Sequence, residues 1–368
     1  MTAICKYNKQ HPLRVFEAFA GYGSQSLAFK YLKDKHPEFD FMVVGYSETE
    51  PSAIQAYGLL HGRDIPNFGD VTRIDWNEVP DFDFISWSSP CRDFANAGLR
   101  QGAEEGSGTR SSLIFQEKRM LAVRKPKYVM LENVKGLLSK SMRKYFFQYV
   151  RDLDSFGYTS FYKVLNAGDY GIPQNRERIF VISILRTEDE PDPEYHFPSP
   201  IKLETTVEDI LEDGVSPDIS CPSPFSKSIS QKQTSVNQPE NSTRKIAIPE
   251  TADGCSPTIK TTIDTANMTF VTIMNKEIIH TAPNGKRYSI QIRKYTPRDC
   301  FRLMGVHEAD IDKLLSKEKT GQLIISKSKL YALAGNSTVT NCLTAMFEEL
   351  IFPSGNHYHD KTGQLYLF

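Results

Sequence analysis

The sequence has no apolar run that approaches the roughly 18 residues that a membrane-spanning helix needs. Its first residues, MTAICKYNKQHPLRVFEAFAG, lack the charged, apolar and small-residue order of a signal peptide, so we expect a cytoplasmic protein. No two of its six cysteines are close in sequence, which excludes a Cys-x-x-Cys zinc site or redox pair. We expect most of them to be buried thiols.

The chain also has almost no excess charge, because 44 Lys and Arg stand against 45 Asp and Glu. This balance excludes a protein that holds nucleic acid by bulk electrostatics alone, so any polyanion must meet a local basic patch. Residues 186–218 hold 2 basic and 11 acidic residues, whereas residues 219–290 hold 8 basic and 5 acidic ones. We interpret the first stretch as an acidic connector and the second as a separate, loop-rich module.

Short apolar runs alternate with turn residues through the first half of the chain, which predicts an α/β fold with a parallel sheet. The predicted strands are 13–18, 41–46, 82–87, 128–131, 160–166 and 178–185. Helical patterns return near the C-terminus, at 299–304 and 338–351. Ligands of such sheets lie beyond the carboxyl ends of the strands, so the residues that follow each strand are the candidates for function.

Three of these strand-end features point to an adenosine-containing cofactor. Residues 19–25 read Phe-Ala-Gly-Tyr-Gly-Ser-Gln, and the two glycines allow a tight turn that comes close to a ligand. Glu48 can accept hydrogen bonds from ribose hydroxyls, and Asp70 can accept one from an adenine amine. The alternatives are a structural turn, a surface glutamate and a turn-capping aspartate.

Residues suited to chemistry follow the later strands. Cys91 lies in Ser-Ser-Pro-Cys-Arg-Asp-Phe, an exposed turn where Arg92 and arginines from later segments favour the thiolate. Glu132 ends the next strand and can donate a proton if burial raises its pKa. Arg176 and Arg178 share one side of an extended chain and suit phosphates or a carbonyl oxygen. A buried structural thiol and a salt-bridge network are the alternatives.

As a set, these residues resemble the DNA cytosine-5 methyltransferase family of bacterial or phage type. The resemblance covers about 1–185 and 293–368 and rests, in chain order, on Phe-Ala-Gly-Tyr-Gly, Ser-Glu, Gly-Asp-Val, Pro-Cys, Arg-Ser-Ser-Leu, Glu-Asn-Val, Gln-x-Arg-x-Arg and Ala-Gly-Asn-Ser. It implies a Rossmann-like, S-adenosylmethionine-dependent catalytic domain over 1–218. A smaller target recognition domain is expected over 219–290, and the segment 291–368 is expected to return to the catalytic domain.

The resemblance also implies a reaction, in which a methyl group passes from S-adenosylmethionine to carbon 5 of a flipped-out cytosine in double-stranded DNA. S-adenosylhomocysteine would be the product, and no metal would be required. Cys91 would attack ring carbon 6, Glu132 would hold nitrogen 3, and Arg178 would reach the cytosine carbonyl. Arg176 would lie near other polar or phosphate groups, and Gln174 would orient the segment. The implied cofactor residues are Phe19, Ala20, Gly21, Tyr22, Gly23, Glu48, Asp70, Val71, Pro90, Leu113, Asn336 and Ser337. The implied DNA contacts are Arg92, Gln174, Arg244, Lys245, Thr258, Ile259 and Lys260.

The chain departs from the usual pattern at Arg92, where the family commonly has Gln, and at Thr49 and Ser89, where larger residues are common. None of these departures removes a catalytic group. Four glycines within 93–112 predict a mobile flap that can close over the extruded base. We expect a monomer on DNA, associated with a prokaryotic nucleoid and paired with a separate restriction endonuclease.

Two alternatives to DNA methylation stay open at this point. The first is methylation of cytosine in transfer RNA, although the Cys-Phe-Thr signature of those enzymes is absent from the variable region. The second is an inactive family member that serves as a binding module, against which the presence of Cys91, Glu132 and Arg178 argues.

Overall fold

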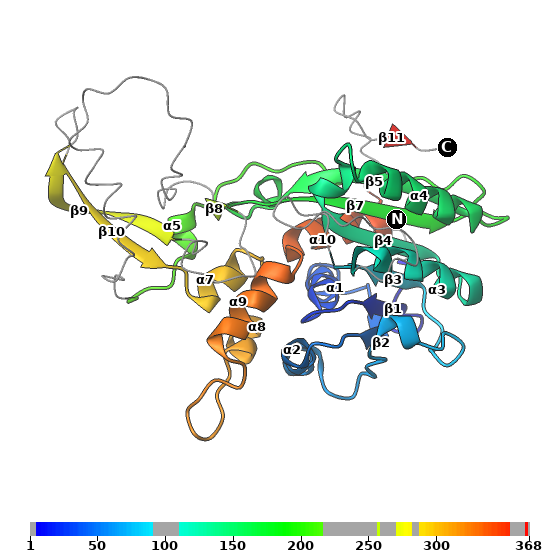
Figure 1. Ribbon diagram of the computed structural model, residues 1–368, viewed down its shortest axis with the longest axis horizontal. Helices are drawn as coiled ribbons and strands as arrows, with labels where there is room; N and C mark the ends of the chain where they lie inside the picture. Colours follow the sequence, from blue (N-terminus) through cyan, green and yellow to red (C-terminus); the bar gives the residue numbers. More distant parts are fainter. Residues whose placement is uncertain are drawn as a thin grey trace.

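A mixed β-sheet forms the centre of the protein (Figure 1). The computed structural model describes residues 5–90, 110–215, 256–257, 270–281, 287–353 and 365–366. Within them the sheet has the strand order β11-β5-β7-β4-β3-β1-β2. Its strands are β1 (Leu13–Ala18), β2 (Phe41–Ser47), β3 (Phe84–Trp87), β4 (Tyr128–Val134), β5 (Tyr158–Asn166), β7 (Glu177–Leu185) and β11 (Leu365–Tyr366).

All six predicted strands are confirmed, but the prediction of a parallel sheet is wrong on one side. Strands β2, β1, β3 and β4 pair in parallel, whereas β7 runs antiparallel to both β4 and β5. The cause is the short connection 167–176, which holds only η4 (Ala167–Tyr170) and β6 (Gln174–Asn175). A parallel return needs a crossover of a dozen or more residues, usually a helix, so the chain turns back instead.

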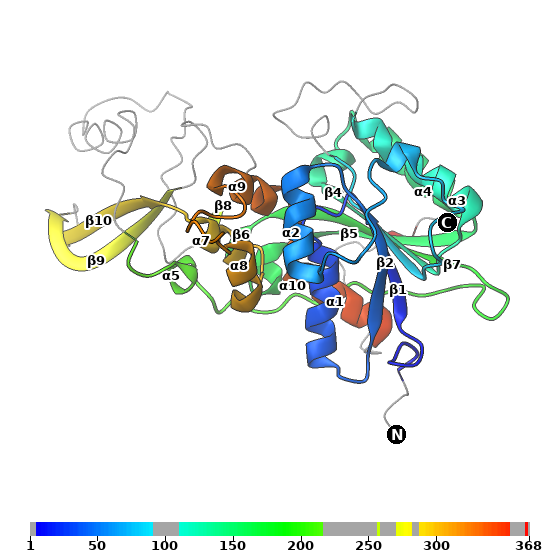
Figure 2. The same cartoon turned by 90° about the horizontal axis from the view of Figure 1, so that it is seen from below.

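Helices cover both faces of the sheet (Figure 2). One face carries α1 (Ser24–Lys35), α2 (Pro51–His61) and α10 (Thr340–Ile351), and the other carries α3 (Glu117–Val123) and α4 (Arg143–Ser155). The alternation of β1 feeds both cores, because Val15 packs on the first face and Phe16 on the second. Phe29 of α1 stacks on Phe347 of α10 with ring centroids 4.1 Å apart, which fixes the C-terminal segment against the first helix.

The remaining elements include three short helices, η1 to η3, whose residues Val71, Ile114 and Leu137 pack into the core under α3 and α4, and a β-hairpin of β9 and β10 that extends away from the sheet (Figure 1). These elements are η1 (Val71–Arg73), η2 (Arg110–Gln116), η3 (Lys135–Leu138), α5 (Val207–Ile210), β8 (Ser256–Pro257), β9 (Phe270–Thr281), β10 (Arg287–Lys294), α7 (Pro297–Arg302), α8 (Glu308–Leu314) and α9 (Lys327–Asn336). The two predicted C-terminal helices are confirmed as α7 and α10, with starts shifted by two residues. The division at 218 and 290 stays a prediction.

The acidic connector is packed against the protein over part of its length. Tyr195 and Phe197 are buried in the same core as α10, and the Tyr195 hydroxyl donates to the Met346 carbonyl at 3.2 Å. The described cysteines, Cys5, Cys300 and Cys342, are free and buried. Among the described residues, no helix is long and apolar enough to cross a membrane.

Candidate active site

The turn after β1 is held in an unusual backbone conformation. Phe19 (φ 57°) is the one non-glycine residue with a positive φ in the described part of the chain, and Gly21 (φ 59°) and Gly23 (φ 81°) flank Tyr22. A Cβ at Gly23 would lie 2.4 Å from His61 Nε2, whereas a Cβ at Gly21 would meet nothing within 4 Å. Gly23 is therefore required by packing against α2, and the space above Gly21 is open to a ligand.

Glu48 joins the ends of β1 and β2. Its Oε2 accepts from the Gly21 amide at 2.9 Å, and its Oε1 accepts from the amides of Thr49 and Glu50. The neighbouring Ala20 amide donates to the Ser47 carbonyl at 3.1 Å. Two segments that the sequence suggested for one cofactor therefore lie in direct contact, with a half-buried carboxylate between them.

Asp70 caps the short helix η1. This is the turn-capping role that the sequence left open as the alternative to an adenine contact. One oxygen, Oδ1, accepts from the Thr72 amide at 2.9 Å and from the Thr72 hydroxyl at 2.8 Å. The backbone hydrogen bond from Thr72 lowers the pKa of Asp70, so its exposed carboxylate stays ionised. Val71 is 3% exposed and packs with the core under α3 and α4, so it has little surface to offer a ligand.

The segment after β3 is anchored from two sides up to Pro90. Asn133 of β4 donates to the Ser89 carbonyl at 3.3 Å, and Gln25 of α1 donates to the Ser88 hydroxyl at 3.1 Å. Pro90 and Leu113 are half-buried. Cys91, Arg92 and the predicted flap as far as residue 109 lie outside the described residues.

Glu132 lies beside both arginines of the later strand. It is 8% exposed, and its Oε1 lies 3.2 Å from Arg178 Nε. Burial raises the pKa of Glu132, while the charges of Arg178 and Arg176 and the Thr338 side chain act against that rise. The carboxyl group can therefore hold a proton more readily than an exposed glutamate, as proton donation requires.

The C-terminal segment closes around this cluster. Arg176 is 2% exposed, and its Nη2 donates to the Gly335 carbonyl at 3.0 Å and the Ser337 carbonyl at 2.6 Å. The Tyr22 hydroxyl donates to Ser337 Oγ at 2.9 Å. Asn336 is exposed and is the last residue of α9. Arg176 thus binds backbone carbonyls, which are polar groups of the kind expected for it, and a phosphate contact stays a prediction.

Of the predicted DNA contacts, Gln174 is fully buried, and its Nε2 donates to the Leu303 carbonyl at 2.6 Å. This burial fits the expected orienting role of Gln174 in the segment that carries the arginines, and it corrects the expectation of a DNA contact. Strand β8 pairs in parallel with β6, so Ser256 lies opposite Gln174. The other predicted DNA contacts, Arg92, Arg244, Lys245, Thr258, Ile259 and Lys260, lie outside the described residues.

Sequence reasoning missed Thr338 and His61. Thr338 is 3% exposed and acts on Glu132. Burial lowers the pKa of His61 to about 4, so the ring is neutral near pH 7 and its Nε2 donates to the Tyr22 carbonyl at 3.0 Å. Thr338 directly follows the Ala-Gly-Asn-Ser motif, which was an available signal, whereas His61 ends α2 without any motif.

Known proteins resemble this chain over most of its length. Residues 13–351 match the family described as C-5 cytosine-specific DNA methylase. Type II methyltransferase M2.ScrFI of Lactococcus lactis subsp. cremoris is 31% identical, with 92% of this chain and 99% of that protein covered. Type II methyltransferase M.Bsp6I of Bacillus sp. is 29% identical over 92% of this chain and 98% of its own.

Solved structures share the fold at lower identity. The Entamoeba histolytica methyltransferase EhMeth superposes with a TM-score of 0.68 at 15% identity, covering 92% of this chain and 98% of its own. The S. pombe Dnmt2 methyltransferase gives a TM-score of 0.65 at 20% identity, covering 93% of this chain and 99% of its own. The Rossmann-like methyltransferase fold expected from the sequence is confirmed by these likenesses.

Proposed function

The chain belongs to the C-5 cytosine-specific DNA methylase family and is a sequence-specific DNA cytosine-5 methyltransferase, and from this premise we propose how its own residues carry the reaction. The observation that carries the proposal is a cluster beside the Tyr22 turn, made of Glu132, Arg176, Arg178 and Thr338. It brings a proton-holding carboxyl group and two guanidinium groups to the end of the sheet where the Ser88–Pro90 segment is anchored.

We propose that the Phe19–Gly23 turn, Glu48 and Asp70 hold S-adenosylmethionine. The open space above Gly21, the half-buried Glu48 carboxylate and the exposed Asp70 carboxylate fit a ligand with a ribose and an adenine amine. When bound, S-adenosylmethionine supplies an electrophilic methyl group. The proposed cofactor set also includes Ala20, Val71, Pro90, Leu113, Asn336 and Ser337. Ala20 and Val71 are buried, so they would support the site from beneath.

The Cys91 thiolate attacks carbon 6 of the flipped-out cytosine, and a C–S bond forms between them. The electron pair of the 5,6 double bond moves onto carbon 5, which becomes nucleophilic. Glu132 donates its proton to nitrogen 3, and Arg178 donates to the carbonyl oxygen, so the charge that develops on the ring is neutralised. Carbon 5 would take the methyl group, with S-adenosylhomocysteine as the other product, and would then lose its proton to a base. The C–S bond breaks, which restores the aromatic ring and the thiolate.

A duplex that carries 5-fluorocytosine at the methylated position tests the covalent step. After methyl transfer carbon 5 has no proton to lose, so the C–S bond cannot break and the complex survives denaturation. We expect wild-type protein to form this complex with the mass of the methylated DNA added, and Cys91→Ala to form none. A trapped complex with Cys91→Ala, or full methylation by that variant, would refute Cys91 as the nucleophile.

The cellular setting is also a proposal. The relatives M2.ScrFI and M.Bsp6I are type II methyltransferases, which supports a prokaryotic restriction-modification setting with a separate endonuclease. The enzyme would then act as a monomer on the nucleoid in the cytoplasm. Glu132→Gln, Cys91→Ala and the wild type, each expressed with a candidate endonuclease, show whether methylation protects the host DNA.

A further inference from the structure

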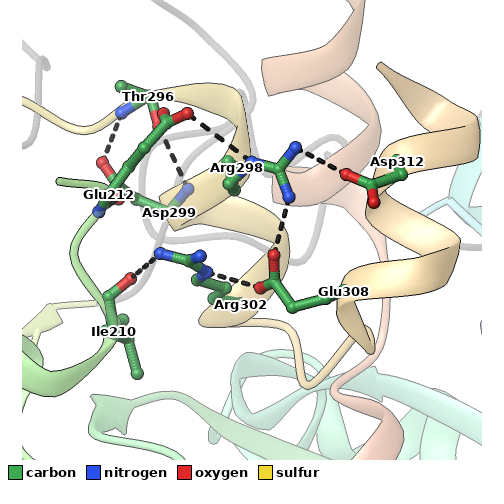
Figure 3. A network of polar contacts seen from close by, with 8 residues as sticks. All are labelled: Ile210, Glu212, Thr296, Arg298, Asp299, Arg302, Glu308 and Asp312. Carbon is green, nitrogen blue, oxygen red and sulfur yellow. Dashed lines mark hydrogen bonds and ion pairs between the residues drawn. The ribbon is translucent and has the colours of Figure 1, made fainter. Parts of the chain in front are cut away.

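The chain leaves and re-enters the catalytic part at one place, beside the short helix α7 (Figure 3). It leaves after α5 at Glu212 and returns at Thr296, the cap of α7. Asp299 of α7 is fully buried and binds the outgoing and the returning chain. Its Oδ1 accepts a hydrogen bond from the Glu212 amide at 2.6 Å, and its Oδ2 accepts one from the Thr296 amide at 2.7 Å. One carboxylate therefore joins the two ends of the segment 213–295.

Two arginines extend this junction to α8 (Figure 3). Arg298 lies 2.6 Å from a Glu308 oxygen, 2.7 Å from an Asp312 oxygen and 3.5 Å from a Glu212 oxygen. Arg302 Nε donates to Glu308 at 2.6 Å, and its Nη1 donates to the Ile210 carbonyl at 2.9 Å. The planar guanidinium groups thus bind the outgoing connector and α8 to α7 in a defined geometry.

The other end of α7 leads to the active-site arginines. Leu303, directly after α7, accepts the hydrogen bond from Gln174, two residues before Arg176. Gly305 follows with φ 73°, where a Cβ would lie 2.2 Å from Asn341 Oδ1 of α10, so the turn that follows α7 is closely packed on α10. A chain of short contacts therefore runs from the junction to the residues around Glu132.

We propose that Asp299 is a positioning residue for DNA discrimination: it sets the orientation of the segment 213–295 relative to Arg176 and Arg178. The inference rests on the proposed assignment of target recognition to 219–290. A carboxylate can accept from two amides at once, whereas an Asn in the same place offers one acceptor oxygen and turns an NH₂ group toward the other amide. Asp299→Asn therefore removes the hydrogen bond to either the Glu212 amide or the Thr296 amide, while it preserves the size and shape of the side chain.

The chain offers a matched control for a purely local role. Thr206 and Asp209 form the same capping box on α5, in which Asp209 Oδ2 accepts from the Thr206 amide at 2.7 Å. Asp299 binds the Glu212 amide of a second segment as well as the cap of its own helix, whereas Asp209 binds Thr206 within its own capping box. A helix-capping effect alone would therefore appear in Asp209→Asn and Asp299→Asn alike.

The test compares kcat and KM on a duplex with the recognised site and on one with a single changed base pair, together with the Kd of S-adenosylmethionine. We expect Asp299→Asn to raise KM for the correct duplex and lower the discrimination ratio about tenfold, with cofactor Kd within about twofold of wild type. Asp209→Asn should match wild type in all three. Equal effects of the two variants, or loss of cofactor binding in step with DNA discrimination, would overturn the proposal.

A second variant keeps the test decisive if Asp299→Asn does not fold. Arg298→Gln removes the ion pairs to α8 and the connector but leaves the capping box intact, and it should lower discrimination in the same direction, with partial rescue by Arg298→Lys. An unchanged ratio would overturn the proposal. The wild-type protein distinguishes failure of this proposal from failure of the proposed function. If it does not methylate DNA, the proposed function is refuted. If it methylates both duplexes equally, the recognition role is refuted.

Discussion

Glu117 is a buried carboxyl group whose ionisation should weaken the fold. It begins α3 and is 1% exposed, among Met120, Leu121 and other apolar residues beneath the sheet. The Tyr149 hydroxyl is close enough to act on Glu117, but neither Glu117 oxygen nor that hydroxyl forms a hydrogen bond of regular geometry among the described residues. Burial raises the pKa of Glu117 from 4.5 to about 8, although the Tyr149 side chain acts against the shift.

The sign of the pH dependence follows from this raised pKa. Below about pH 4.5 the group is protonated in both the folded and the unfolded chain, and stability is at its full value. Between pH 4.5 and about 8 only the unfolded chain ionises, so stability falls as pH rises. At about 1.36 kcal/mol per pKa unit, the loss is roughly 3 kcal/mol at pH 7 and about 5 kcal/mol above pH 8.

Glu117→Gln keeps the shape of the protonated side chain and removes the ionisation. Free energies of unfolding from urea denaturation at pH 5.5, 7.0 and 8.5 should show the variant more stable than wild type, with a gap that widens as pH rises. The exposed Glu78→Gln is the matched control and should leave the gap near zero at all three values. A gap that does not change with pH, or a variant less stable than wild type at pH 8.5, would refute the reasoning.

Two further predictions concern the site. Glu132→Gln removes the proton that the raised pKa retains, so single-turnover methyl transfer should fall about 10²- to 10⁴-fold with cofactor Kd unchanged; a rate within twofold of wild type would contradict this. Gly23→Ala brings a Cβ to within 2.4 Å of His61 Nε2, so calorimetry should show cofactor Kd weakened about tenfold or more. Gly214→Ala shares the positive φ but meets open space, and equal cofactor affinity in the two variants would contradict the packing argument.

The sequence was informative where local pattern governs structure. The strands and the turn around Gly21 follow from periodicity and glycine placement, and the contact of Gly21 with Glu48 follows from both lying at the same sheet edge. The antiparallel direction of β7 was not predicted, because an apolar strand has the same sequence pattern whichever way it runs in the sheet. The short connection 167–176 was the available signal.

Other features depended on contacts between distant segments. Arg176 was expected near polar or phosphate groups, but the sequence did not disclose that residues 335 and 337 supply the carbonyls that bind it. Gln174 was expected near DNA, but it is buried against Leu303. The bridge from Asp299 to Glu212 spans 87 residues, and no local pattern distinguishes it from the ordinary capping box at Asp209. Pairings of this kind are set by the tertiary fold, so one sequence does not disclose them.

The most direct test of the central claim is a map of 5-methylcytosine in a host that has none of its own. Genomic DNA and transfer RNA are sequenced after expression of the wild type and of Cys91→Ser. The account predicts 5-methylcytosine at one short DNA motif in cells with the wild type, and none with the variant. Modification of transfer RNA alone, or no modification in either nucleic acid from a protein that still binds S-adenosylmethionine, would contradict it.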